Sequence, residues 1–419
     1  MLSESQKAHA RKISIIEGGF ATVWGAFTGG FSGNSYLVGF FLWLGATPFV
    51  MSIYGALIPL ASVIQPFSLM LARTFTSKKR FILLVAILSR PTFLTLAIVV
   101  LINTGMKVWI ALFIFFFFEI AVSSAGPAWQ AWMSDLVDQR VRGRYFGLRN
   151  LITGLVSVPA TLAAGYVLDV LGGGLWAFFT MFAIGSVFGA LDVYALKIQD
   201  EDPAPTGNML NPHVLIEVLK LKGDYRKFLI AYILMTFAGT ISGPYPTVMM
   251  IDDFHYSYAL LGLITVASSL AAAFAQPVWG RLGDRYGPFK MLKIVTFFRA
   301  FLMLGWALAL PSLIYMLPFQ IIIGIVANAG LGLMSFNTLL NVVPTFGKTE
   351  ALSLYSSLVN FASFIGNIIS GLFVIILAEV HFNFIGLTFN DYRIIFFITF
   401  LVRLAVFYYV YRIKLEKSS

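Results

Sequence analysis

The sequence predicts an all-α polytopic membrane protein with twelve transmembrane helices in two six-helix halves. Of its 419 residues, 59% are hydrophobic and only 11% are charged, whereas soluble globular proteins carry about a quarter charged residues. Several apolar stretches exceed the ~20 residues that a helix needs to cross the hydrocarbon layer. These stretches do not alternate between apolar and polar residues, so we expect helices rather than the strands of a barrel.

Twelve apolar segments fit such helices, and one long polar stretch separates the first six from the last six. The segments cover residues 13–38, 47–72, 81–103, 108–133, 144–170, 175–197, 226–250, 258–281, 291–310, 313–340, 351–380 and 393–412. The polar stretch predicts a linker at 198–225, with one short surface helix at 212–221, between halves at 1–197 and 226–419. "GTISGPYP" brings Gly and Pro together in the seventh segment, which predicts a break there.

The basic residues predict the orientation. The N-terminus, the even-to-odd connections, the linker and the C-terminus hold 24 of the 29 Lys and Arg. Lys107 and Arg393 fall on the other side, and Arg90, Arg299 and Arg403 fall inside segments. Since positive charge gathers on the cytoplasmic side, we expect a multi-pass protein of the inner (cytoplasmic) membrane with both termini cytoplasmic. No long basic run or RNA-binding motif occurs, so no nucleic-acid partner is expected.

The two halves share short phrases. The pair Gln-Pro at 65–66 recurs at 276–277, which is 211 positions later, and Arg90 has the same place in the third segment as Arg299 in the ninth. Two related six-helix halves joined by a linker are typical of transporters, with the substrate site near mid-membrane between the halves. There is no Cys, which excludes Cys nucleophiles and thiolate metal sites. No metal cluster or catalytic triad occurs either, so no enzyme activity and no cofactor are expected.

The connection after the eighth segment carries a recognisable motif. Gly280, Asp284, Arg285 and Gly287 form a Gly-x-x-x-Asp-Arg-x-Gly pattern followed by Lys290. With "RGRYFGLRN" at 142–150 and twelve segments, the chain resembles the major facilitator superfamily over nearly its whole length. The resemblance implies that segments one, four, seven and ten line a central cavity. It also implies a small-molecule substrate, a lipid bilayer around the protein and action as a monomer.

Polar and aromatic side chains in these four segments are the candidates for the substrate cavity, although most could equally serve packing between helices. They are Trp24, Asn34, Ser123, Trp129, Gln130, Tyr232, Tyr245, Gln320, Asn328 and Asn337.

Glu119 is the strongest candidate for coupling, because charged groups inside the membrane are costly and often functional. It lies about eleven residues into its segment, or ~16 Å deep at 1.5 Å per residue. It could neutralise Arg90 in the neighbouring segment, or bind a proton or a cationic substrate. Glu17 could be an interfacial residue, or a gate or coupling group. Arg90, Arg299 and Arg403 are expected to pair with polar groups of neighbouring helices, with anion recognition as the alternative.

The motif also predicts a cytoplasmic gate. In the superfamily, segment eight faces segment five and segment two faces segment eleven, so Asp284 would face the basic start of segment five. In the first half the place of Asp284 is taken by Arg73, which could pair with Glu350 or simply anchor the loop. Besides Asp284, Arg73 and Glu350, the gate candidates are Gly280, Arg285, Gly287, Arg142, Arg144 and Arg149.

Two kinds of transport remain open. Glu119 and the aromatic cavity favour proton-coupled export of amphipathic, drug-like compounds. Segment five contains Gly154, Pro159 and Gly165 but lacks the adjacent Gly-Pro of many exporters, which leaves uptake of sugars or other metabolites as the alternative. A membrane sensor or scaffold that transports nothing would have little use for charge inside the membrane.

Overall fold

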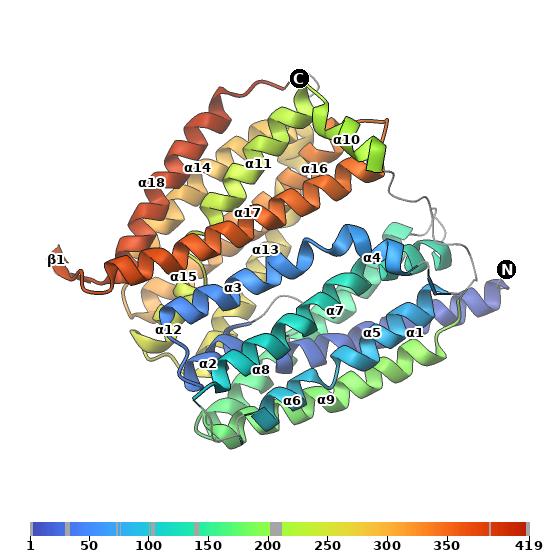
Figure 1. Ribbon diagram of the computed structural model, residues 1–419, viewed down its shortest axis with the longest axis horizontal. Coiled ribbons are helices and arrows are strands. Elements are labelled where there is room, and N and C mark those ends of the chain that lie inside the picture. Colours follow the sequence, from blue (N-terminus) through green and yellow to red (C-terminus); the bar gives the residue numbers. More distant parts are fainter. Residues whose placement is uncertain are drawn as a thin grey trace. The chain divides into compact units, whose positions relative to one another are not determined.

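Helices dominate the computed structural model (Figure 1). It describes residues 3–29, 34–72, 74–75, 77–99, 101, 105–137, 142–201, 212–384 and 387–415. Within these ranges the β structure is one antiparallel hairpin, in which Phe382 pairs with Phe389. This hairpin is not among the elements that the sequence predicts.

Helical structure occupies all twelve predicted segments. Up to residue 198 the helices are α1 (Glu4–Thr28), α2 (Ser35–Trp43), α3 (Pro48–Ser62), α4 (Gln65–Ala72), α5 (Lys78–Ser89), α6 (Thr92–Val99), α7 (Lys107–Leu136), α8 (Arg142–Val170) and α9 (Leu175–Ile198).

The rest of the chain contains α10 (Pro212–Lys220), α11 (Asp224–Thr240), α12 (Tyr245–Asp252), α13 (Tyr258–Tyr286), α14 (Pro288–Ala307), α15 (Leu313–Ile323), the π-helix η1 (Gly324–Gly330), α16 (Leu331–Val342), α17 (Lys348–Leu377), β1 (Phe382–Phe384), β2 (Leu387–Phe389) and α18 (Asp391–Arg412). Of the segments described, nine are long and apolar enough to cross a membrane. The protein is therefore an all-α polytopic membrane protein.

Three of the predicted continuous helices are interrupted. The prediction of one helix over 13–38 is wrong: Gly29 ends α1 in the left-handed conformation, with φ of 78°, which glycine adopts without steric cost. The Asn34 side chain then caps α2 by accepting a hydrogen bond from the Leu37 amide. The segment over 81–103 breaks after Arg90, where Pro91 lacks an amide hydrogen, and the segment over 47–72 breaks between α3 and α4.

The predicted break in segment seven and the predicted linker helix are both confirmed. Residues 241–244 separate α11 from α12, and Gly243 has a positive φ of 48°. The helix α10 ends one residue before its predicted limit. Segment ten contains the unpredicted π-helix η1, a form that is often found at functional sites.

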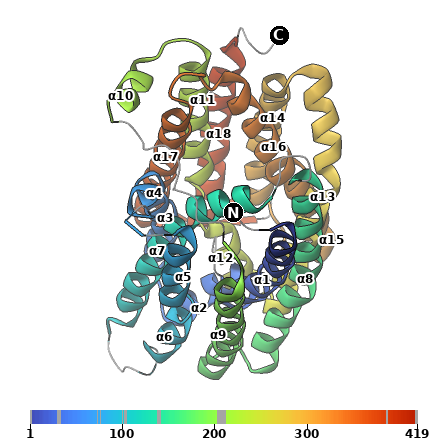
Figure 2. The ribbon, with the colours of Figure 1, turned by 90° about the vertical axis from the view of Figure 1, so that its right-hand side faces the viewer.

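The chain divides into two compact units. Unit 1 comprises Met1–Ala46, Ala61–Met209 and Ser257–Gly262, and unit 2 comprises Thr47–Leu60, Leu210–Tyr256 and Leu263–Ser419. In unit 1, α1 packs along α9 and α8. In unit 2, α14 packs along α18, and α11 packs against α17 (Figure 2).

Unit 1 includes the first turn of α13, which α8 holds. Both carboxylate oxygens of Asp169 accept backbone hydrogen bonds, from the amides of Tyr258 and Ala259, each at 2.8 Å. This is a side-chain cap on a helix N-terminus, where free amides and the helix dipole favour an anion. Nearby, a Cβ on Gly165 would lie 2.6 Å from the Tyr258 carbonyl oxygen, so only glycine permits this approach.

Unit 2 includes most of α3, which packs on α17 with similar closeness. A Cβ on Gly371 would lie 2.0 Å from the Ser52 hydroxyl oxygen, and one on Gly55 would lie 2.8 Å from Asn367 Oδ1. The hydroxyl of Tyr245 donates toward the carbonyl oxygen of Ser370 at 3.4 Å. Small residues therefore allow these helices to meet at the backbone, as is common between membrane helices.

Close helix packing predicts the outcome of a glycine comparison in segment ten. A Cβ on Gly324 would lie 2.1 Å from the Ser268 carbonyl oxygen, whereas one on Gly332 would meet nothing within 4 Å. We expect Gly324→Ala to cost about 1–3 kcal/mol of stability by overpacking, and Gly332→Ala to cost nothing. Thermal unfolding of the purified variants measures both. Equal melting temperatures for the two would contradict the packing described.

Candidate functional site

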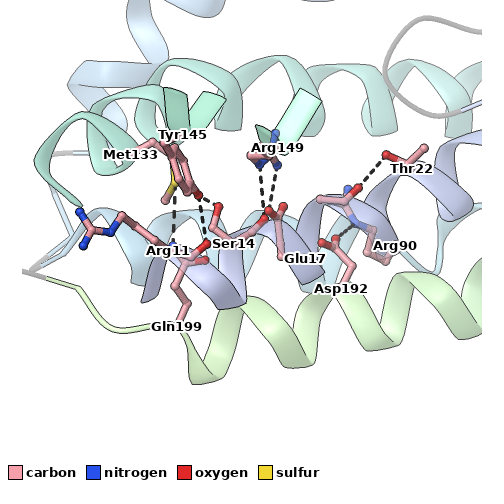
Figure 3. A network of polar contacts seen from close by, with 11 residues as sticks. Arg11, Ser14, Glu17, Thr22, Arg90, Met133, Tyr145, Arg149, Asp192 and Gln199 are labelled. Carbon is pink, nitrogen blue, oxygen red and sulfur yellow. Dashed lines mark hydrogen bonds and ion pairs between the residues drawn. The ribbon is translucent and has the colours of Figure 1, made fainter. Parts of the chain in front are cut away.

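Four charged side chains gather inside unit 1. We call Glu17, Arg90, Arg149 and Asp192 the charged cluster. They come from α1, the C-terminal cap of α5, α8 and α9, respectively (Figure 3). Three of them are buried and Arg149 is nearly so. Burying a charge among membrane helices requires a partner, and the cluster supplies one for each member.

Glu17 and Arg149 form the first pair. Arg149 Nη2 donates to Glu17 Oε2 at 3.0 Å, and Arg149 Nε donates to the Ser14 carbonyl oxygen at 3.3 Å. The guanidinium also lies over the Trp129 ring, 4.6 Å from its centroid, which adds a cation–π interaction. Gly18 makes room for the arginine, since a Cβ there would lie 2.8 Å from Arg149 Nη2.

Arg90 and Asp192 form the second pair. Arg90 Nε donates to Asp192 Oδ2 at 2.7 Å, and the guanidinium lies 4.1 Å from the centroid of the Trp24 ring. Asp192 is completely buried. Gly189, one turn earlier on α9, admits both Trp24 and Arg90, because a Cβ there would lie 2.9 Å and 3.1 Å from them. The pair therefore joins the end of α5 to α9, with α1 beside it.

The two pairs interact electrostatically with each other. Glu17 lies close enough to interact with the Asp192 carboxylate and with the guanidinium groups of both arginines. Two acids and two bases give the charged cluster no net formal charge. The second Asp192 oxygen, Oδ1, is buried without a hydrogen-bond partner among the described residues, so the cluster is balanced in charge but not fully satisfied in hydrogen bonds.

Glu119 on α7 is the exception to this balance. It is 2% exposed, and its Oε1 has no hydrogen-bond partner in the described structure. The prediction that it neutralises Arg90 is wrong, because Arg90 pairs with Asp192 instead. Ser123, one turn further along α7, lies 3.3 Å from the Ser62 hydroxyl. Glu119 and Ser123 thus place two polar groups on one face of α7.

Asp192 is the residue that the sequence analysis missed. It is the only acidic residue in the segment over 175–197, and a lone carboxylate in an apolar span is a recognisable signal. From the sequence, the expected partner of Arg90 is Glu119 on the neighbouring segment, whereas the structure pairs it with Asp192. Depth alone could not distinguish Glu119 from Asp192, since only packing determines which helix each side of α5 faces.

The candidate cavity residues occupy different environments. Trp24 and Trp129 join the charged cluster through the contacts given above, and Tyr245 is fully buried in unit 2. Tyr232 stacks on Tyr355, with ring centroids 5.3 Å apart. Of the remaining candidates, Ser123 and Gln320 are buried, Asn34 caps α2, Asn328 donates to Ser268, Asn337 is partly buried and Gln130 is exposed.

The candidate gate residues are described only in part. Arg73 and the side chain of Arg142 lie outside the described residues, so the pairing of Arg73 with Glu350 stays a prediction. Gly287 has φ of 88° and starts the turn into α14, a conformation that favours glycine. The other candidates are placed as follows: Gly280 lies within α13, Asp284, Arg285 and Arg144 are exposed, Glu350 is buried in the first turn of α17, and Arg149 pairs with Glu17.

The known proteins that this chain resembles are consistent with the helical membrane architecture described above. Residues 228–418 match the family model "Major Facilitator Superfamily". An 87-residue stretch is 36% identical to YncC of Bacillus subtilis (strain 168), covering 21% of this chain and 18% of that protein. The chain therefore spans about a fifth of the length of this curated relative.

Solved structures match the chain over nearly its full length. A point mutant of the nucleoside transporter NupG gives a TM-score of 0.74 at 14% identity, covering 97% of this chain and 99% of that one. A bacterial homologue of the iron transporter ferroportin gives 0.70 at 12% identity, covering 98% and 99%. A bacterial homologue of the human lysosomal transporter Spinster gives 0.70 at 13% identity, covering 98% and 97%. At these identities the likeness concerns the fold.

The charge balance predicts different costs for two isosteric changes. Asp192→Asn leaves Arg90 buried without its anion, and breaking a buried pair costs about 3–5 kcal/mol. Glu119→Gln removes no ion pair and keeps the shape, so its melting temperature should stay close to that of the wild type. Thermal unfolding in one detergent compares them directly. If Glu119→Gln proves as unstable as Asp192→Asn, Glu119 also balances a buried cation and the assignment is wrong.

Proposed function

We propose that this chain, a membrane transporter of the Major Facilitator Superfamily, moves a small organic solute by secondary active transport and couples it to proton movement. The observation that carries the proposal is Glu119, a buried carboxylate with an unpaired oxygen, in the same unit as a charged cluster that is already balanced. We further propose that it acts as a monomer in the inner membrane, with both termini cytoplasmic, and that residues 1–197 and 226–419 are its two functional halves.

The physical argument concerns what neutralises Glu119. A carboxylate anion away from water and from cations is costly. Within the described residues, the buried arginines of unit 1 already serve Glu17 and Asp192. A proton or a cationic group on the substrate is the remaining way to remove the charge, and both can arrive and leave during a transport cycle. If a proton and a cationic substrate bind Glu119 in turn, the two compete for one carboxylate, which is a simple basis for antiport.

We favour export of amphipathic, drug-like compounds, because Glu119 would accept a cationic centre while nearby aromatic rings accept apolar groups. Phe118, next to Glu119 on α7, packs against Trp24 and Phe93. The second candidate is an uptake symporter for sugars or other metabolites. It is favoured by the incomplete exporter motif in α8, where Val158 rather than Gly precedes Pro159.

Alternating access supplies the transport step, and we propose that Asp169 belongs to an outer gate. In this proposal, the hydrogen bonds from the amides of Tyr258 and Ala259 to Asp169 hold α13 against α8 while the external side is closed. Tyr36 adds a second contact, because its hydroxyl donates to the Thr161 carbonyl oxygen at 2.6 Å. Opening would release these hydrogen bonds to water, so a modest change in their strength shifts the equilibrium between states.

Glu119→Gln tests the coupling. A ligand that binds only the folded protein raises its apparent stability, so a thermal-shift panel of lipophilic cations, sugars and nucleosides first identifies a transported probe. In proteoliposomes with a proton gradient, the wild type should accumulate the probe. The variant should lose accumulation but retain exchange of the probe across the membrane, since glutamine keeps the shape and cannot titrate. Full gradient-driven accumulation by Glu119→Gln would rule the residue out.

Asp169→Asn tests the gate. The absence of native Cys allows spin labels at two introduced cysteines, Val170→Cys and Leu263→Cys, both exposed positions. An amide has one acceptor oxygen and no charge, so the cap weakens by about 1 kcal/mol and the outward-open population should rise roughly fivefold. Pulsed spin–spin distance measurements should then show more of the longer distances.

Glu379→Gln is the matched control, because this exposed acid near the end of α17 makes no hydrogen bond or ion pair within the described structure. Its distance distribution should equal that of the wild type. An unchanged distribution in Asp169→Asn would show that Asp169 is not part of a gate.

A further inference from the structure

Unit 2 contains two positively charged side chains near the middle of membrane helices. Arg299 lies near the middle of α14 and Arg403 near the middle of α18, and they line one small cavity with α11 (Figure 2 shows these three helices). The cavity is small: the centre of a water-sized sphere can move within about 10 Å³ of it. Its lining residues are Met235, Ala238, Thr296, Arg299, Arg403 and Val406.

The guanidinium of Arg403 donates hydrogen bonds to neutral carbonyl groups. Its Nη2 donates to the Gly239 carbonyl oxygen at 2.8 Å, its Nη1 to the Arg299 carbonyl oxygen at 3.1 Å and its Nε toward the Ala238 carbonyl oxygen at 3.3 Å. These bonds confirm the expectation that Arg403 pairs with polar groups of neighbouring helices. They satisfy its donors in part, but carbonyl dipoles do not cancel its charge, and the side chain is only 8% exposed.

The guanidinium of Arg299 has fewer polar contacts than that of Arg403. Its Nε is buried without a hydrogen-bond partner, and within the described ranges its guanidinium forms no ion pair or hydrogen bond. The guanidinium comes close to α11, because a Cβ on Gly239 would lie 3.4 Å from Arg299 Nη2. The hydroxyl of Thr296, which donates to the Leu292 carbonyl oxygen at 2.7 Å, is neutral and cannot balance the charge of the guanidinium.

No carboxylate of the three helices is near enough to balance the two charges. Their acidic residues are Asp224 and Asp391, each in the first turn of its helix. At 1.5 Å per residue, Asp224 is about 21 Å along α11 from Ala238, and Asp391 is about 18 Å along α18 from Arg403. Unit 1 pairs each arginine of its charged cluster with an acid, whereas this part of unit 2 pairs none.

We propose that the cavity between Arg299 and Arg403 binds one small inorganic anion, with chloride as its natural occupant. Two adjacent cations in a low-dielectric interior repel each other and lack hydration, and a single anion between them relieves both costs. The size of the cavity excludes an organic anion. Its position at mid-helix excludes a lipid headgroup, which stays at the membrane surface.

The binding test compares chloride with a larger anion. The melting temperature of the purified wild type is measured in sodium chloride against sodium gluconate at equal sodium concentration. Because the anion binds the folded state, the melting temperature should rise by about 1–2 °C for each tenfold increase in chloride above the dissociation constant. Broadening of the ³⁵Cl NMR signal, reversed by excess bromide, should report the same site directly.

Arg299→Gln is the decisive variant, because the Arg299 side chain has no hydrogen bond to lose and the variant should fold. It should abolish both the chloride-dependent stabilisation and the line broadening. Arg393→Gln is the matched control: it removes a buried arginine from α18, bonded to the carbonyl oxygens of Ala307 and Ala309, outside the cavity. Its baseline stability should fall while the chloride effect remains.

Three results would overturn the proposal. The first is a wild type with equal melting temperatures in chloride and gluconate, which would leave the cavity to water. The second is an Arg299→Gln variant that keeps the full chloride effect. The third is an Arg393→Gln variant that loses the chloride effect, which would place any bound anion elsewhere.

Discussion

An arginine buried among membrane helices must find something to balance its charge, and this constraint organises the structure. In unit 1 the solution is a carboxylate for each buried guanidinium: Asp192 for Arg90 and Glu17 for Arg149. Glycines on α1 and α9 open the space for these side chains. The pairs therefore fix how four helices approach one another, because shifting any one of them would strand a charge away from water.

This balance gives Glu119 its significance. If the arginines of the charged cluster were unpaired, a further carboxylate would be an ordinary structural partner. Since they are paired, Glu119 is a buried acid whose charge state can change without breaking an ion pair among the described residues. Near Arg299 and Arg403, the three helices of unit 2 carry no acid at the corresponding depth, so Arg403 binds carbonyl oxygens instead. Buried arginines are thus paired with carboxylates in unit 1, whereas Arg403 in unit 2 is hydrogen-bonded to carbonyl oxygens.

Much of the fold could be predicted from sequence, because hydropathy and turn chemistry are local. The twelve segments, the break at 241–244 and the helix α10 follow from residues that are neighbours in the chain. The partner of Arg90 could not be predicted, since spacing along a helix gives depth but not the direction that a side chain faces. The break after Gly29 was not predicted either. Nor was the hairpin of Phe382–Phe384 and Leu387–Phe389, because a short apolar strand resembles the end of a membrane-spanning segment.

The central claim is that Glu119, and not a member of the charged cluster, is the carboxyl group that gains and loses a proton. Infrared difference spectroscopy of the reconstituted protein across a pH titration measures this most directly, because the carbonyl stretch of a protonated carboxylic acid is distinct from that of a carboxylate. The account predicts a titrating carboxylic-acid band in the wild type that is absent in Glu119→Gln and present in Glu17→Gln. A band that persists unchanged in Glu119→Gln would contradict it.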